Sequence, residues 1–262
     1  MLVCFDVDGV LVDVSQSYHQ ALFDTVSSLL HPESSRVEPE VLLKLKCLLN
    51  LNNDWDAALA GILFYLSGRS VEDFVRALSA GPPDFRKFYR WAEKQRIELP
   101  SYDFLVEIFE DFYRQRRSRE KLNISLSGLA EIRSMARILA IITGRTKEDL
   151  DFTFQKYSLY QFFDFILTED DLPSVECRKP SPYALQQLFL KSGPCFPACY
   201  IGDTLSDSRM VLSFNCQENQ RVHFILFRNA LNTDIQADFY VSDENDLRQV
   251  LKKLKEEFEA RH

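Results

Sequence analysis

The chain has 262 residues, of which 46% are hydrophobic and 27% are charged, and this composition excludes a wholly disordered protein. Its net charge of −8 argues against general binding to nucleic acid or to an anionic membrane surface, and we expect neither partner. The chain has no apolar run long enough for a membrane span. Its early aspartates are unlike a secretory signal peptide, and its cysteines are scattered. We therefore expect a cytoplasmic protein.

The first predicted element is a short apolar strand, Leu2–Phe5, and a long helical stretch follows it. Between about residues 15 and 125 there is almost no strand pattern. Apolar residues recur there at helical spacing, as Leu59, Ile62, Leu63 and Leu66 do. The pattern predicts helices over about 16–30, 38–50, 55–66, 71–79, 84–94 and 102–118.

From Ile138 onward, apolar strands alternate with amphipathic helices. The predicted strands are Ile138–Ile142, Phe163–Leu167, Ala198–Ile201, His223–Phe227 and Phe239–Val241. The predicted helices are Lys147–Tyr157, Pro182–Lys191, Ser206–Phe214 and Asn245–Phe258. Such alternation is typical of a parallel sheet with right-handed crossovers. We therefore predict an α/β fold, a doubly wound parallel-sheet core of residues 1–14 and 126–262, interrupted by an all-helical domain of residues 15–125.

Polar groups follow two of these strands directly, where a parallel sheet places its ligands. Asp6 and Asp8 come after the first strand, and in an extended chain residues two apart face the same side. Two close carboxylates repel, which favours a functional site, although Asp8-Gly9 could also be a simple turn. Thr143 and Gly144 end the second strand at the start of a helix. They suit an anion cradle, and equally a helix cap.

Two further segments carry a lysine and a second pair of acids. Lys179 precedes a proline at the start of a predicted helix, which is also an ordinary way to begin a helix. Asp203 and Asp207 lie on either side of a turn from a strand into a helix. Carboxylates so placed suit a hard cation such as Mg²⁺, although an aspartate there could instead cap the helix.

Taken together, the four segments resemble the motifs of the haloacid dehalogenase superfamily of phosphohydrolases. The resembling stretches are DVDGVLVD (6–13), IITGR (141–145), RKPSP (178–182) and GDTLSD (202–207). Val10 stands where threonine is frequent in the family. The resemblance covers about residues 1–15 and 125–245, and it implies a Rossmann-like core of subfamily I whose inserted helical domain is a cap.

The resemblance implies a Mg²⁺-dependent phosphatase that hydrolyses a small phosphomonoester through an aspartyl-phosphate. In that scheme Asp6 is the nucleophile, Asp8 the acid and base, and Lys179 balances charge. Thr143 and Gly144 bind the phosphoryl oxygens, and the metal site comprises Asp6, Asp8, Asp203 and Asp207. Apart from the resemblance, Arg145 is a candidate to bind phosphate or a second anionic group of the substrate, although it could instead be a solvated surface arginine. The alternatives are a phosphotransferase or phosphomutase that uses the same intermediate, or a catalytically silent binding protein on the same fold.

Within the predicted cap, the polar island Leu51–Asp56 offers candidate substrate contacts. Asn52, Asn53 and Asp54 lie there, although one of them could simply cap the following helix. The expected partner is a small phosphorylated metabolite whose identity the cap would decide. We expect a monomer or a weak homodimer.

Overall fold

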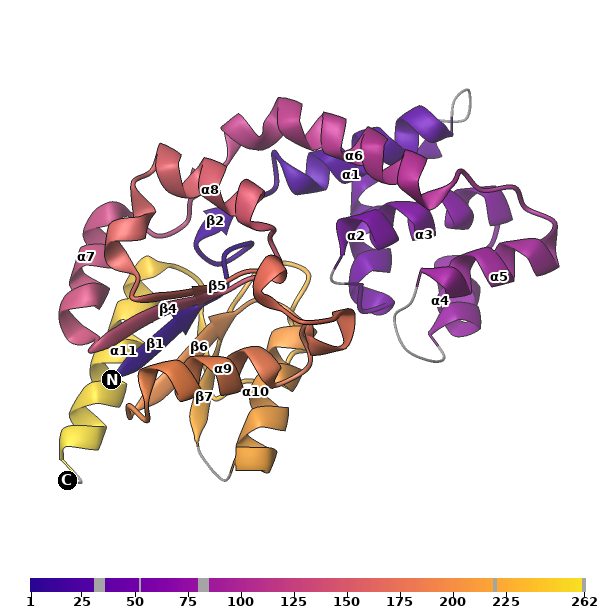
Figure 1. Ribbon diagram of the computed structural model, residues 1–262. Coiled ribbons are helices and arrows are strands. Elements are labelled where there is room, and N and C mark those ends of the chain that lie inside the picture. The colour runs from indigo at the N-terminus through magenta and orange to yellow at the C-terminus, as the bar shows by residue number, and fades with distance from the viewer. Residues whose placement is uncertain (31–35, 52, 80–84, 219–220, 261–262) are drawn as a thin grey trace. The chain divides into compact units, whose positions relative to one another are not determined.

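The computed structural model describes residues 1–30, 36–51, 53–79, 85–218 and 221–260, which form two compact units (Figure 1). One unit comprises Met1–Asp13 and Lys121–His262, and the other comprises Val14–Glu120. The prediction from sequence ended the insertion at residue 125. The chain re-enters the first unit earlier because β3 (Lys121–Leu122) pairs antiparallel with β2 (Val12–Asp13).

The first unit is built on a six-stranded parallel sheet in the order β5-β4-β1-β6-β7-β8, which confirms the predicted α/β class. All four residues of the central strand β1 are fully buried. A parallel strand covered on both faces requires such a continuous apolar run. The strands are β1 (Leu2–Phe5), β4 (Ile138–Ile142), β5 (Phe165–Leu167), β6 (Ala198–Gly202), β7 (Val222–Phe227) and β8 (Phe239–Val241).

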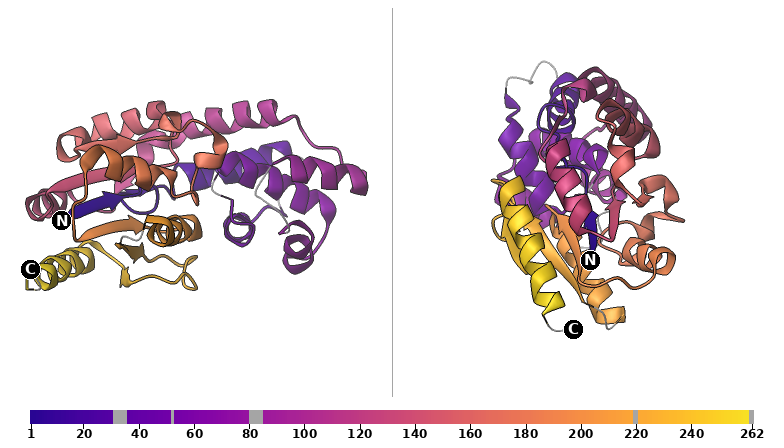
Figure 2. Two further views of the ribbon diagram at one scale, coloured as in Figure 1. Left: turned by 60° about the horizontal axis from the view of Figure 1, so that its bottom comes forward. Right: turned by 90° about the vertical axis from the view of Figure 1, so that its left-hand side faces the viewer.

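Helices cover both faces of this sheet. One hydrophobic cluster joins alternate strand residues such as Leu2 and Cys4 to α9 (Tyr183–Ser192) and α10 (Leu205–Glu218). The yellow helix α11 (Glu244–Glu259) lies on the opposite side of the sheet from α9 (Figure 2, right). The remaining helix bounds of this unit are α7 (Leu126–Met135), which the sequence prediction omitted, and α8 (Lys147–Lys156).

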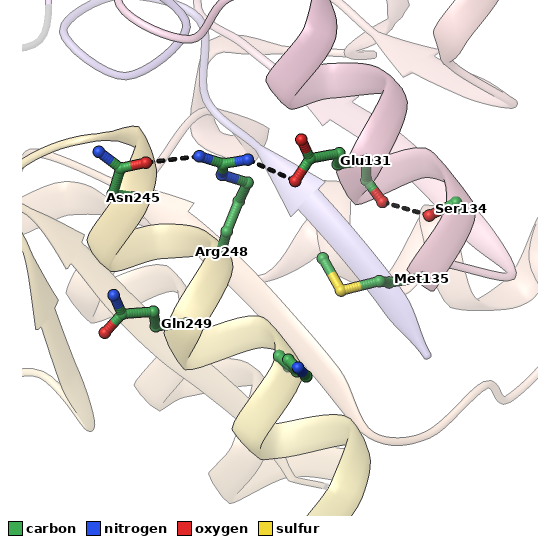
Figure 3. Close-up of a pocket in the computed structure, with 7 residues that line it drawn as sticks. Glu131, Ser134, Met135, Asn245, Arg248 and Gln249 are labelled. Atoms are coloured by element: carbon green, nitrogen blue, oxygen red, sulfur yellow. Dashed lines mark hydrogen bonds and ion pairs between the residues drawn. The ribbon is translucent and has the colours of Figure 1, made fainter.

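Helices α7 and α11 also contact each other directly. Arg248 of α11 forms an ion pair with Glu131 of α7 and a hydrogen bond with Asn245 (Figure 3). Ser134 and Met135 help to line the shallow hollow between these helices. The contact joins α7, the first described helix after Lys121, to α11, the last described helix of the chain.

The second unit is entirely helical among its described residues. Its helices are α1 (Tyr18–Leu29), α2 (Pro39–Leu48), α3 (Asp54–Ser67), α4 (Val71–Leu78), α5 (Arg86–Gln95) and α6 (Tyr102–Arg116). Helix α3 supplies the centre of the core, where Leu59 and Leu63 are fully buried. In the described part of the chain, no helix is both long and apolar enough to cross a membrane.

We predict that Leu59→Ala lowers the free energy of unfolding by about 2–5 kcal/mol, because it removes a fully buried side chain and leaves a cavity. Urea denaturation measures the change. The matched control is Leu66→Ala on the same helix, where the side chain is 44% exposed, and we expect a change within about 0.5 kcal/mol. Equal losses in the two variants would contradict this account of the core.

Candidate active site

The polar segments singled out from the sequence meet at one edge of the sheet. Strand β1 lies between β4 and β6, so the residues that follow these three parallel strands are neighbours. Asp6 follows β1, Thr143 follows β4, and Asp203 follows β6. The backbone N–H of Asp6 still donates to the carbonyl of Ile201, 2.8 Å away, which holds the ends of β1 and β6 together.

Lys179, whose side chain is only 11% exposed, joins two of the acids. The Nζ atom of Lys179 lies 3.0 Å from Oδ2 of Asp6 and 2.8 Å from Oδ1 of Asp207. Burial by itself would lower the pKa of Lys179, but the carboxylates of Asp207 and Asp6 outweigh it and raise the pKa above its ordinary value. Lys179 therefore remains charged and balances part of the negative charge of the cluster.

Asp207 already has partners for both of its oxygens. Its Oδ1 accepts from Lys179 and from the Tyr200 hydroxyl, which is 3.0 Å away, and its Oδ2 accepts from the hydroxyl and the backbone N–H of Thr204. Burial alone would raise the pKa of Asp207, but Lys179 and the Thr204 hydrogen bonds hold it below its usual value. Asp207 thus fits a role in holding Lys179 better than direct contact with a metal ion.

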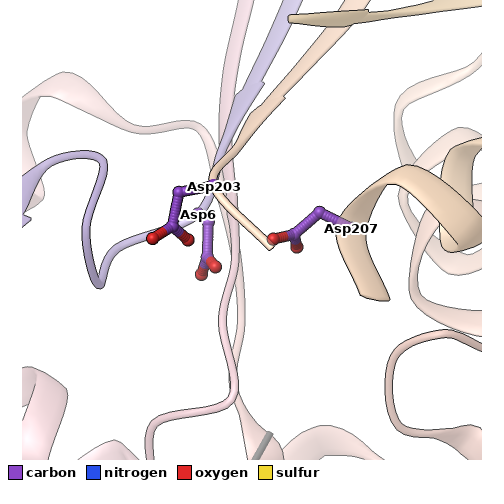
Figure 4. A group of neighbouring side chains, drawn as sticks. All are labelled: Asp6, Asp203 and Asp207. Atoms are coloured by element: carbon purple, nitrogen blue, oxygen red, sulfur yellow. The ribbon is translucent and has the colours of Figure 1, made fainter. Parts of the chain in front are cut away.

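The pKa of Asp203 is shifted in the opposite direction from that of Asp207. Burial raises its pKa well above the ordinary value, and the nearby carboxylates of Asp207 and Asp6 raise it further. Ligand oxygens of Asp6, Asp203 and Asp207 all lie within 4.8 Å of one another. Figure 4 shows Asp6 and Asp203 at the ends of adjacent strands, with Asp207 facing them from α10. The positive charge of Lys179 lowers the pKa of Asp203, but by less than burial and the neighbouring carboxylates raise it.

The charges of the site fit a divalent cation. Four carboxylates meet two buried cationic side chains, because Lys179 pairs with Asp6 and Asp207 while Arg145 pairs with Asp8. If all four carboxylates are counted as ionised, two negative charges are left over, and the raised pKa of Asp203 shows that an ionised carboxylate is unfavourable there without a further cation. The ligand oxygens of this cluster lie within 4.8 Å of one another, so small side-chain shifts would bring two of them within the roughly 4.2 Å that joint binding to one Mg²⁺ allows. Asp6 and Asp203 are the residues that could hold such an ion.

A tight turn at Gly9 leaves room for the side chain of Asp203. Gly9 adopts φ +72°, and a Cβ atom built there would lie 2.1 Å from Oδ2 of Asp203. The turn is closed by the N–H of Gly9, which donates to the carbonyl of Val12 at 2.9 Å. Any side chain at residue 9 would be both strained and in collision with Asp203.

Arg145 and Asp8 form an ion pair at this edge. Nη2 of Arg145 lies 2.6 Å from Oδ1 of Asp8, and the arginine side chain is fully buried. The guanidinium was expected from sequence to contact phosphate or a second anionic group. In the structure it is engaged with Asp8 and with Thr153, whose Oγ1 accepts from Nη1 at 3.0 Å. Its contacts therefore lie within the protein.

Thr143 and Gly144 form the turn expected to hold phosphate. The buried Oγ1 of Thr143 accepts from the backbone N–H of Arg145 at 3.1 Å, so its own hydroxyl proton can donate elsewhere. A Cβ atom built on Gly144 would meet nothing within 4 Å. The turn thus has open space beside a hydroxyl and a backbone N–H, the groups that an anion cradle needs.

The polar island of the helical unit has internal roles. The Asn53 side chain caps α3 by accepting from the backbone N–H groups of Trp55 and Asp56. Asp54 forms an ion pair with Lys46, 2.6 Å away. Asn52 lies outside the described residues. Substrate contact by these three residues stays a prediction.

Several residues that support the site were not singled out from the sequence. Tyr200 was hidden within the apolar run of β6. Asn229 and Asn232 contact Asp203: Nδ2 of Asn229 donates to its Oδ2 at 3.3 Å, and Nδ2 of Asn232 donates to its backbone carbonyl at 2.8 Å. Both asparagines follow strand β7. The rule that polar residues at the ends of parallel strands form the site would have found them.

Comparison with known proteins supports a relationship over most of the chain. Residues 1–215 match the family model of haloacid dehalogenase-like hydrolases. The phosphatase Tt82 from Thermococcus thioreducens has a similar structure, with a TM-score of 0.68 and 25% sequence identity, covering 96% of this chain and 99% of that one. CbbY from Rhodobacter sphaeroides, in complex with phosphate, shares the fold with a TM-score of 0.59 and 16% identity, covering 94% and 95% of the two chains.

A relative found by sequence is a longer protein. Over 204 residues the chain is 26% identical to an imidazoleglycerol-phosphate dehydratase from Phytophthora nicotianae. The match covers 77% of this chain, and it spans only 39% of the length of that protein.

We predict that Gly9→Ala lowers the free energy of unfolding by at least about 1–2 kcal/mol, because alanine is strained at positive φ and its Cβ collides with Asp203. Thermal and urea unfolding measure the loss. Gly144→Ala is the control, since its Cβ would enter open space, and we expect a change within about 0.5 kcal/mol. Equal stability of the two variants would contradict the close approach of Gly9 to Asp203.

Proposed function

Because the chain belongs to the haloacid dehalogenase-like hydrolase family, we propose that it is a Mg²⁺-dependent phosphatase of a small phosphomonoester. Asp6 would serve as the nucleophile and form an aspartyl-phosphate. The observation that carries the proposal is the residual negative charge at Asp6 and Asp203 beside the Lys179 ion pairs. The similarity to a phosphatase at 25% identity over nearly the whole chain supports it.

Asp6 is held as a nucleophile requires. Its Oδ1 accepts from the backbone N–H of Val7 at 2.7 Å, and its Oδ2 lies 3.0 Å from Lys179. These contacts fix the orientation of the carboxylate at the end of β1. In the first step an oxygen of Asp6 bonds to phosphorus as the bond from phosphorus to the leaving oxygen breaks.

Asp8 supplies and removes the proton in the two steps. In the first step its carboxyl group gives a proton to the leaving oxygen. In the second, its carboxylate takes a proton from water as that water attacks phosphorus and the bond to Asp6 breaks, which restores the free nucleophile. Its side chain is 37% exposed, so substrate and water can reach it.

The remaining groups bind and balance the phosphoryl group. The Thr143 hydroxyl and the Gly144 N–H are placed to donate to phosphoryl oxygens, and the Lys179 ammonium offsets their charge. Asp6, Asp203 and the backbone carbonyl of Asp8 would hold Mg²⁺. The ion, when bound, offsets repulsion between the carboxylate nucleophile and the anionic phosphate.

The longer relative suggests one class of substrate to include in a screen. Its name refers to an imidazole-bearing polyol phosphate, which is a phosphomonoester. A screen should therefore combine sugar phosphates, carboxylic-acid phosphates, nucleotides and imidazole-bearing alkyl phosphates. The helical unit would decide among them, and Asn52, Asn53 and Asp54 remain our candidates for substrate contact there.

We predict that Asp6→Asn reduces phosphate release from every hydrolysed ester by about 10⁴-fold or more, since the amide cannot form the aspartyl-phosphate. Inorganic phosphate is measured over the ester panel. Asp111→Asn is the control, because that carboxylate on α6 is 57% exposed, and its activity should match the wild type.

Other outcomes of the same screen would select the alternatives. Transfer of phosphate to an added second hydroxyl compound, with little free phosphate, would indicate a phosphotransferase or mutase. Equal release by the wild type and Asp6→Asn would reject the nucleophile. A wild type that releases no phosphate from any ester would support a silent binding protein.

We also predict that Mg²⁺ binds to the wild type and that Asp203→Asn weakens this binding by at least about 10–100-fold, because the variant removes one of the two unbalanced charges. Isothermal titration calorimetry measures the affinity, and chelator should abolish phosphate release in parallel. Asp111→Asn should bind the ion as the wild type does. Unchanged affinity in Asp203→Asn would remove Asp203 from the metal site.

A further inference from the structure

We infer that Arg145 is a positioning residue for Asp8, which turns one chosen oxygen of that carboxyl group toward the reacting phosphoryl group, and that it is not a substrate ligand. This inference rests on the proposed phosphatase function.

The contacts between the two side chains fall on a single oxygen. Nε of Arg145 donates to Oδ1 of Asp8 at 2.7 Å, and Nη2 lies 2.6 Å from the same atom. Two donors on Oδ1 leave Oδ2 as the oxygen that can give and take a proton. The rigid, planar guanidinium fixes where Oδ1 lies. Because the backbone fixes Cβ and the carboxyl group is planar, the position of Oδ2 is then fixed as well.

The guanidinium is itself held from behind. Its Nη1 donates to Oγ1 of Thr153, 3.0 Å away on helix α8, and Thr153 is fully buried. The backbone of Arg145 is fixed as well: its N–H donates to Thr143, and its carbonyl accepts from Glu169 at 2.9 Å. The arginine therefore has little freedom to follow a substrate.

Burial separates the positioning role from substrate binding. The side chain of Arg145 has no exposed surface, whereas that of Asp8 is 37% exposed. A buried guanidinium that lost its carboxylate partner would be left as an unpaired charge, which is strongly unfavourable. The pair is therefore kept while the exposed side of Asp8 meets substrate and water.

This orientation matters in both chemical steps. Oδ2 gives its proton to the leaving oxygen as the Asp6–phosphorus bond forms and the ester bond breaks. Oδ2 later takes a proton from the attacking water as the Asp6–phosphorus bond breaks. A poor leaving group needs the first proton transfer, and a stable phenolate leaving group does not. Loss of positioning should therefore depend on the leaving group, which a merely structural defect does not.

The test compares Arg145→Gln with the wild type on glycerol 3-phosphate, an alkyl ester, and on 4-nitrophenyl phosphate, an aryl ester. The ratio of kcat/KM for the alkyl ester to that for the aryl ester should fall by about 10-fold or more, since kcat/KM reports the first step. With 4-nitrophenyl phosphate the variant should also show a burst of nitrophenol before a slower steady rate, because the aspartyl-phosphate accumulates.

Two further variants separate positioning from folding. Thr153→Val removes the hydroxyl behind Arg145 and should lower the same ratio by a smaller factor. Arg133→Gln is the matched control, because Arg133 also pairs with a carboxylate through two contacts, 2.7 and 3.0 Å from Asp164, at an exposed position on α7. It should leave the ratio unchanged.

Equal losses on the two esters in Arg145→Gln, or a raised KM for both with unchanged kcat, would overturn the inference and restore Arg145 as a substrate ligand. A crystal structure of Arg145→Gln gives a check that needs no activity: Asp8 should adopt a different side-chain orientation, and an unchanged one would also overturn it. Failure of the proposed function would instead appear as undiminished phosphate release in Asp6→Asn.

Discussion

The balance of buried charge at the end of the central strands is the constraint on which the rest of the site depends. Carboxylates gathered out of water destabilise the fold unless cations neutralise them. Lys179 does so by pairing with Asp6 and Asp207 at once, and Arg145 does so for Asp8. The charge that remains is what a divalent cation would balance. Such an ion, when bound, would also offset the repulsion between these carboxylates and an anionic phosphoryl group.

The parallel sheet brings these groups together at close range. Because β1 lies between β4 and β6, the residues after three strands share one edge without long loops. The acids then approach the backbone closely. A Cβ atom on Gly202 would lie 2.5 Å from Cβ of Asp207, and one on Gly9 would reach Asp203. Glycine at these two positions is a packing requirement of the acid cluster.

The two cationic side chains of the site pair with different carboxylates. Lys179 pairs with Asp6 and Asp207, and the fully buried Arg145 pairs with Asp8. Under the proposed function, Lys179 would hold the nucleophile and Arg145 would orient the proton donor. The helical unit has a hydrophobic core of its own around α3. Under the proposed function, the first unit would carry the chemistry and the helical unit would decide which substrate is accepted.

The sequence by itself determined the α/β class, the strand ends that carry Asp6, Thr143 and Asp203, and the family, because strand periodicity and short motifs are local properties of the chain. Only the tertiary structure decided which charges pair. Arg145 was expected to contact an anion of the substrate and instead meets Asp8, and Tyr200 was hidden in an apolar strand. Packing and burial determine which residues distant in sequence contact each other. Such contacts leave no local pattern in the sequence from which they could be predicted.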